Sequence, residues 1–240
     1  MADRTTPHPV AVITGASQGL GRALAEALAD AGWWLVVDAR RADRLEAAVT
    51  ELATRTRVVG VPGDVTDSWH RARIADAAAA LGPIALVVHN ASTLGASPLP
   101  SLDEIDLDVL RDVFETNVLA PIALNQALEP FLAPDATIVS ITSDAAVEPY
   151  PGWGGYGASK AALEHASRIL AAERPDRRVL VVDPGDMRTE MHQDAFPGED
   201  ISDRPEPATV VPRLLALLDS DLPSGRYRAA DVAVPAGADA

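Results

Sequence analysis

A tyrosine and a lysine spaced four residues apart could form a proton-transfer pair. Tyr156 and Lys160 make a Tyr-x-x-x-Lys motif, and Lys160 is the only lysine of the chain. On a helix this spacing places both side chains on one face. A nearby ammonium favours the phenolate, and the pKa of a tyrosine must fall from about 10 toward neutrality, by about 4 kcal/mol, for useful proton exchange. The motif therefore predicts a general acid/base tyrosine with Lys160 as its electrostatic partner.

Three polar residues fit the same chemistry. Ser143 ends a predicted strand thirteen residues before Tyr156, where its hydroxyl could donate to a substrate carbonyl. Asn117 lies within a predicted helix, although amides are mediocre helix formers, and Asn90 follows a buried strand. Each has a structural explanation, as a strand-end cap, a kink and a turn respectively. Their joint occurrence favours an active site at the carboxyl edge of a sheet.

A glycine-rich turn follows the first predicted strand. Gly15, Gly19 and Gly21 have the spacing G-x-x-x-G-x-G and open a helix. Such a turn lets the backbone approach a pyrophosphate and directs helix N-terminal amides at its charge. Three glycines also suit a plain tight turn, but their position after the first strand favours a dinucleotide site.

The end of the second predicted strand bears on the choice of cofactor. The usual position of an acidic residue that binds a ribose diol falls on Ala39, and Arg40 and Arg41 follow it. An arginine here suits a 2′-phosphate, so NADP(H) is favoured. Asp38 leaves NAD(H) open, because a shift of one residue would bring its carboxylate to the diol, and the two arginines could also be solvated charges at a helix start.

Short apolar runs alternate with amphipathic stretches along the chain. This order predicts an α/β fold, a Rossmann-like doubly wound parallel sheet with helices on both faces. The predicted strands are 10–14, 33–38, 58–61, 84–89, 137–143, 179–183 and 226–229, and the predicted helices are 20–31, 42–53, 67–81, 103–128, 157–173 and 208–218. Residues 187–207 carry prolines and acidic residues with little periodicity, which favours a substrate lid over disorder.

Composition limits the class of protein. The 240 residues suit one domain, 1–240, and the net charge of −15 without a basic cluster excludes nucleic-acid binding. The chain has no cysteine, so thiolate metal sites are excluded and no metal is expected. Residues 1–7 do not resemble a signal peptide, and the longest uncharged stretch is interrupted by glycine and proline. We therefore expect a cytoplasmic protein without a membrane span.

Taken in order, these motifs resemble the compact branch of the short-chain dehydrogenase/reductase family over nearly the whole chain. The resemblance implies a seven-stranded sheet, hydride transfer between NAD(P)(H) and a carbonyl or alcohol, and a homo-tetramer or homo-dimer formed through the helices of Asn117 and Tyr156. It implies a catalytic set of Asn117, Ser143, Tyr156 and Lys160. Beside Tyr156 and Lys160, the implied cofactor-binding residues are Gly15, Ser17, Gln18, Gly19, Leu20, Gly21, Ala39, Arg40, Asp64, Val65, Asn90, Ala91, Pro184, Gly185, Met187 and Thr189.

Two positions depart from the family pattern. Ser92 replaces the last glycine of the usual N-N-A-G, and Gln18 stands where NADPH enzymes often carry a basic residue. Two other functions are possible: an epimerase or dehydratase holding NAD, whose members are longer and usually carry G-x-x-G-x-x-G, and an NADP(H)-sensing module without turnover, which typically lacks the Tyr or the Lys.

The substrate is predicted to be a small carbonyl or alcohol compound. An apolar or aromatic pocket is expected, although Trp153 and Phe196 could equally serve packing; the candidate lining is Tyr150, Trp153, Met191, His192 and Phe196.

Overall fold

The computed structural model describes residues 8–234 of the chain, so the predicted absence of a signal peptide in residues 1–7 lies outside the described residues. The strands are β1 Val10–Ile13, β2 Trp34–Ala39, β3 Val58–Pro62, β4 Ile84–His89, β5 Leu132–Ile141, β6 Arg178–Asp183 and β7 Gly225–Arg228. The helices are α1 Gly19–Asp30, α2 Ala42–Leu52, α3 Ser68–Ala79, α4 Leu107–Phe114, α5 Ala120–Leu128, α6 Gly154–Glu173, α7 Glu190–Ala195 and α8 Pro207–Leu218. Between residues 8 and 234, no helix has the length and apolar character needed to cross a membrane.

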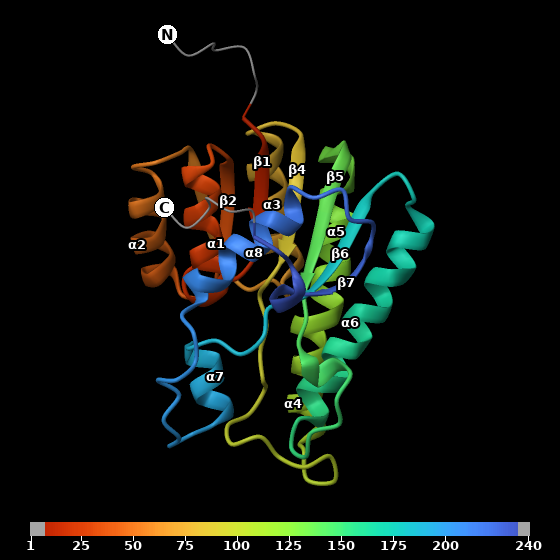
Figure 1. Ribbon diagram of the computed structural model, residues 1–240. Coiled ribbons are helices and arrows are strands. Elements are labelled where there is room, and N and C mark those ends of the chain that lie inside the picture. The colour runs from red at the N-terminus through yellow and green to blue at the C-terminus, as the bar shows by residue number, and fades with distance from the viewer. Residues whose placement is uncertain (1–7, 235–240) are drawn as a thin grey trace.

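All seven strands pair in parallel in the order β3-β2-β1-β4-β5-β6-β7. The chain runs outward from β1 to β3, then crosses back so that β4 pairs with the other side of β1 (Figure 1). The loops after β1 and β4 therefore leave the sheet in opposite directions and open a crevice, which is where ligands of such sheets bind. The predicted doubly wound α/β domain is confirmed.

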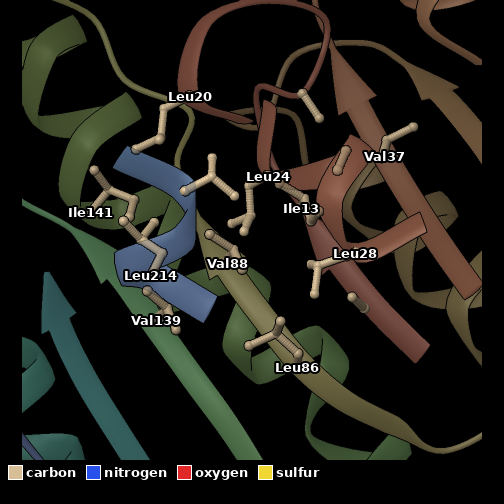
Figure 2. Close-up of a cluster of buried hydrophobic side chains, with 14 of the residues drawn as sticks. Ile13, Leu20, Leu24, Leu28, Val37, Leu86, Val88, Val139, Ile141 and Leu214 are labelled. Atoms are coloured by element: carbon tan, nitrogen blue, oxygen red, sulfur yellow. The ribbon is translucent and has the colours of Figure 1, made fainter. Parts of the chain in front are cut away.

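Helices cover both faces of the sheet because strand residues alternate between two cores. Ala11 and Ile13 of β1 point into the core under α1, α2 and α8, while Val10 and Val12 point into the core under α3 and α5. Figure 2 shows the first core, with Leu24 and Leu214 from two helices meeting Val88 of β4. These strands are buried on both faces, as near-continuous apolar runs predict.

The stretch 103–128, predicted as one helix, is divided. Residues 103–106 form no helix, and α4 begins after Asp106, whose side chain accepts a hydrogen bond from the backbone N–H of Asp108. A π-helical turn, Glu115–Leu119, separates α4 from α5 and contains Asn117. The extra residue in such a turn interrupts the 3.6-residue period, and π-turns occur often at functional sites.

Candidate active site

The carboxyl ends of the strands open into a cleft of about 550 Å³. Figure 1 shows α7 and the segment before α4 extending beyond this end of the sheet. Most residues singled out from the sequence line the cleft: Gly15, Ser17, Gln18, Leu20, Ala39, Arg40, Asp64, Val65, Asn90, Ala91, Ser143, Tyr156, Lys160, Pro184, Gly185, Met187 and Thr189. Of the predicted catalytic and cofactor-binding residues, three do not line it, namely Gly19, Gly21 and Asn117; of the predicted substrate lining, Tyr150 and Phe196 do not.

The glycine turn is pressed against the end of β4. Gly15 has φ +67°, and a Cβ at this position would lie 2.9 Å from Cα of Ala91. The Asn90 amide donates to the carbonyl oxygens of Thr14 and Gly15, at 2.9 and 3.0 Å. A Cβ on Gly21 would lie 2.4 Å from this amide. Glycine is therefore required at both positions, and Asn90 holds the turn to the strand.

Asp38 is buried and its two carboxylate oxygens are engaged within the protein. One accepts the backbone N–H of Gly15 at 2.8 Å, and the other lies 2.9 Å from Nε2 of His70 on α3. Burial raises the pKa of Asp38 above its ordinary value, although both hydrogen bonds act in the opposite direction. Asp38 thus fixes the glycine turn; Ala39, which follows it, is also buried, and Arg40 is the first exposed residue after the strand.

A third arginine, Arg44 on α2, joins Arg40 and Arg41 in the cleft lining. It donates to the side chain of Gln18 and, at 2.5 Å, to the carboxylate of Glu190 on α7. The hydrogen bond from Arg44 is the main cause that lowers the pKa of Glu190. Sequence reasoning missed Arg44, although its spacing of four from Arg40 on a helix start was a signal.

Lys160 is almost completely buried. Its Nζ donates to the carbonyl oxygen of Ile141 at 2.9 Å and lies 5.4 Å from the centroid of the Tyr156 ring. Burial lowers the pKa of Lys160 to about 8. The helix α6 therefore places the pair side by side, as the spacing predicted.

The pKa of Tyr156 differs from expectation. The sequence predicted a lowered value through Lys160, but burial raises the pKa of Tyr156 well above its ordinary value, and the carboxylates of Asp144 and Asp183 add to the rise. Hydrogen bonds with Ser92 and Ser143 act in the opposite direction. Desolvation penalises the phenolate, and the same burial lowers the pKa of the Lys160 ammonium that should stabilise it.

Ser143 lies just beyond β5 and caps a short 3₁₀ turn, Asp144–Ala146. Its hydroxyl donates to the Asp144 carboxylate at 2.8 Å, and the other oxygen of Asp144 accepts the Tyr150 hydroxyl at 3.0 Å. Asp144 is a neighbour of the site that sequence reasoning missed, although it follows Ser143 directly. It places a negative charge beside the reacting hydroxyls.

The Asn117 side chain is fully buried and joins three segments. It accepts from the backbone N–H of Thr93 at 2.9 Å and donates to the carbonyl oxygen of the same residue at 2.9 Å. It also donates to the Ser159 hydroxyl on α6 at 3.0 Å, and the Ser92 hydroxyl donates to it at 3.1 Å. Asn117 therefore ties the segment after β4 to the helix of Tyr156.

The end of the cleft beside Tyr156 is aromatic and apolar. Trp153, Met191 and His192 line it, and the Phe196 ring packs 5.8 Å from that of Trp153. Tyr150 is outside the lining and turns toward Asp144.

Residues 187–207, predicted as a lid, contain α7. Thr189 caps this helix by accepting from the backbone N–H of His192 at 3.1 Å, and Arg188 pairs with Glu206. The Ser97 hydroxyl donates to the carbonyl oxygen of Asp194 at 2.6 Å, which joins α7 to the segment after β4.

Comparison with known proteins agrees with this geometry. Residues 9–200 match the short chain dehydrogenase family. The chain is 35% identical over 187 residues to sulfoacetaldehyde reductase 2 of Chromohalobacter salexigens, covering 75% of this chain and 73% of the relative. It is 34% identical over 199 residues to sepiapterin reductase of Bos taurus, covering 76% and 74%. An alcohol dehydrogenase structure from the archaeon Thermococcus sibiricus, complexed with 5-hydroxy-NADP, has a TM-score of 0.81 and 27% identity, covering 92% of this chain and 95% of that one.

The chain belongs to the short-chain dehydrogenase/reductase family. It is an oxidoreductase that acts on a CH–OH or C=O group with NAD(P).

Proposed function

We propose that this enzyme reduces an uncharged, apolar or aromatic ketone or aldehyde to the alcohol with NADPH, and catalyses the reverse reaction at higher pH. One observation carries the proposal: a single cleft joins Ser143, Tyr156 and Lys160 at one end to Arg40 and Arg41 at the other. A dinucleotide would span this arrangement, with its nicotinamide beside Tyr156 and its 2′-phosphate beside the arginines.

The donor set fits the cofactor. Glycine stands at the positions of the turn where a Cβ would clash with neighbouring atoms, so the backbone is open to a phosphate group. The helix α1 begins at this turn, and its N-terminal amides favour the negative charge of a pyrophosphate. Arg40 is assigned to the 2′-phosphate, and Asp38 is assigned to the glycine turn rather than to a ribose diol, because it is buried and each of its oxygens already accepts a hydrogen bond within the protein. The remaining contacts are assigned as the family resemblance implies: Asp64 and Val65 at the adenine, Asn90 and Ala91 at its ribose, and Pro184, Gly185, Met187 and Thr189 at the nicotinamide and pyrophosphate.

A bound reduced nicotinamide supplies the hydride that the carbonyl carbon accepts. Tyr156 gives its phenolic proton to the carbonyl oxygen, and Ser143 donates a hydrogen bond to the same oxygen after turning from Asp144. Lys160 would hold the nicotinamide ribose, and its positive charge beside the Tyr156 ring would favour loss of the phenolic proton. Asn117 shapes the path by which a water returns the proton from solvent.

The charge of the cleft supports an uncharged substrate. The substrate end contains Trp153 and Met191, and Asp186 is among its lining residues. The Asp144 carboxylate lies just behind the lining, where it accepts the Ser143 hydroxyl. An anionic substrate group would meet these carboxylates, and the arginines of the lining follow β2 at the cofactor end. We expect neutral aromatic ketones to be reduced with a higher kcat/KM than matched carboxylated or sulfonated ones.

The first test is reduction of a panel of aromatic ketones, diketones and aldehydes, followed by the absorbance of reduced nicotinamide. Tyr156→Phe should lower kcat by about 10²-fold or more, because the proton donor is lost, and leave NADPH affinity unchanged. Tyr227→Phe is the matched control, since that hydroxyl bonds to Pro223 outside the cleft, and it should keep its rate. A Tyr156→Phe enzyme with most of its activity would refute the assignment.

The cofactor preference has a separate test. Arg40→Ala should raise the KM for NADPH by about 10-fold or more through loss of a charge-assisted hydrogen bond, and leave the KM for NADH nearly unchanged. Arg55→Ala, which removes an exposed arginine paired with Asp30, should change neither value. Equal effects of Arg40→Ala on both cofactors would contradict binding of a 2′-phosphate.

A further inference from the structure

An arginine from the last strand reaches the back of the catalytic site. Arg226 of β7 donates from Nε to the Glu164 carboxylate at 2.9 Å and from Nη2 to the Asp183 carboxylate at 3.2 Å. The same Nη2 lies 3.3 Å from the backbone carbonyl oxygen of Ser143. Glu164 and Asp183 are both 4% exposed, so these are buried charges that require a counterion.

These contacts join the three segments that build the site. Glu164 lies on α6 four residues after Lys160 and eight after Tyr156, on the same stripe of the helix. It also accepts the Thr142 hydroxyl at 2.7 Å, on the residue before Ser143. Asp183 ends β6 and accepts the backbone N–H of Gly185 at 3.0 Å. The guanidinium of Arg226 therefore contacts α6, which carries Tyr156 and Lys160, the segment of Ser143, and the end of β6 before the Pro184–Gly185 turn. It fixes these three segments relative to one another.

Three charged side chains lie near Tyr156, and Arg226 is the counterion of one of them. Lys160 is its neighbour on α6, Asp144 faces it from the 3₁₀ turn and Asp183 from the end of β6. Both carboxylates disfavour the phenolate. Asp144 is held by the Ser143 and Tyr150 hydroxyls, whereas Asp183 is held by Arg226.

Glu164, the second partner of Arg226, has one further cationic neighbour, Arg168. Its Nη2 lies 3.7 Å from the carboxylate, and its side chain is largely exposed. Arg226 is thus the close counterion of two buried carboxylates behind the site.

We propose that Arg226 is a positioning residue of the proposed reductase: it fixes the Ser143 segment through Glu164 and its own contact with the Ser143 carbonyl and, as counterion to Asp183, shields Tyr156 from the negative charge of that carboxylate. The inference rests on the proposed function, because it assigns Tyr156 as the proton donor. Arg226 touches neither substrate nor cofactor in this role.

The test is the pH profile of kcat for ketone reduction and alcohol oxidation in Arg226→Met. Without the counterion the phenolate is less favoured, so the pH at which reduction declines and oxidation rises should move upward by about one pH unit. kcat at neutral pH should fall about 10-fold because Ser143 is less well held. Arg226→Lys keeps the positive charge but loses the planar guanidinium that binds two carboxylates at once. Because the counterion is retained, its pH profile should stay close to that of the parent enzyme.

A second substitution separates charge from structure. Arg226→Met with Asp183→Asn removes one charge of each sign, including the carboxylate that disfavours the Tyr156 phenolate, so this variant should fold and recover at least half of the pH shift. Arg177→Met is the matched control, since it removes a nearly buried arginine paired with Glu129 and Asp176 at the opposite end of β6, and it should leave the pH profile unchanged.

A pH profile that is unchanged in Arg226→Met, or that moves equally in Arg177→Met, would overturn the inference. A purely structural role would lower activity and melting temperature without moving the profile. If Tyr156→Phe abolishes turnover while Arg226→Met leaves the profile unmoved, only this inference fails; if Tyr156→Phe stays active, the proposed function fails as well.

Discussion

Burial shifts the pKa values of Tyr156 and Lys160, the proposed catalytic pair, in opposite directions. It raises the pKa of Tyr156 and lowers that of Lys160 to about 8, because each loses hydration of its charged form. Tyr156 is therefore protonated at neutral pH, which is the form that carbonyl reduction requires. Alcohol oxidation needs the phenolate, so it should be favoured only in alkaline solution.

Lys160 should also reduce the stability of the fold. Its pKa falls from an ordinary value of 10.5 to about 8, which corresponds to about 3 kcal/mol against the folded state when the amine is charged in both states. Lys160→Met should therefore be inactive but melt about 5 °C higher at pH 7, after allowing for the lost hydrogen bond to Ile141.

The sign of the pH dependence makes this prediction specific. Below pH 8 Lys160 is protonated in both states and the penalty is complete; it fades as the pH rises from about 8 to 10.5, where both states are neutral. The difference in melting temperature between Lys160→Met and the parent should shrink over this interval, as measured by thermal unfolding. A difference that stays constant would show that packing, not charge, controls it.

Among the elements, α7 depends on a single cap. Thr189 lies in the cleft lining and accepts from the backbone N–H of His192 at the first turn of this six-residue helix. Loss of an N-cap of this kind costs about 1 kcal/mol. A helix this short cannot persist on propensity alone.

Thr189→Ala should therefore loosen residues 187–207, which we propose form the lid. At saturating cofactor, which removes the effect of the contact assigned to Thr189 in cofactor binding, the KM for the carbonyl substrate should rise about 3- to 10-fold. The overall melting temperature should change little, and hydrogen exchange should be faster in this segment. Thr189→Ser keeps the capping hydroxyl and should restore the KM. Thr50→Ala on the exposed side of α2 is the control. A normal KM in Thr189→Ala would argue against a lid that acts through α7.

What the sequence could predict depends on the range of the interactions. Local patterns placed β4 at Ile84–His89 and set Tyr156 beside Lys160, because both depend only on neighbours in the chain. The break before α4 and the π-turn at Asn117 were missed, since the cap of Asp106 and an extra residue per turn barely alter apolar periodicity.

Contacts between residues far apart in the chain could not be predicted from the sequence. The sequence showed Asp38 beside the expected cofactor position but gave no sign of its partner His70, 32 residues away. Arg226 gave no signal at all, because Glu164 and Asp183 meet it only after β7 joins the edge of the sheet.

At the scale of the whole molecule, the net charge is strongly negative although one part of the cleft is positively charged. The chain carries a net charge of −15, yet Arg40, Arg41 and Arg44 gather where the cofactor phosphate is proposed to bind. Because the surrounding field repels anions, we expect cofactor affinity to depend on these few local contacts rather than on long-range attraction.

The surface of the molecule carries apolar side chains on the helices next to the site. Leu107 of α4, Leu119 of the π-turn, Ile122 of α5 and Ile169 of α6 are 61%, 50%, 37% and 46% exposed in the single chain. The elements α4, the π-turn and α6 pack against one another. Exposed apolar groups gathered on neighbouring elements are typical of a protein interface.

We propose that these helices form the interface of the homo-dimer or homo-tetramer that the family resemblance predicts. Leu119→Glu combined with Ile122→Glu should halve the mass found by light scattering, to that of a single chain from a dimer or of a dimer from a tetramer, because two charges in a symmetric interface meet their copies. Activity should fall with it, since Asn117 lies in the same turn as Leu119. Trp69→Glu, which alters an exposed apolar residue on α3, should leave mass and activity unchanged. A parent enzyme that already has the mass of one chain would refute the proposed interface.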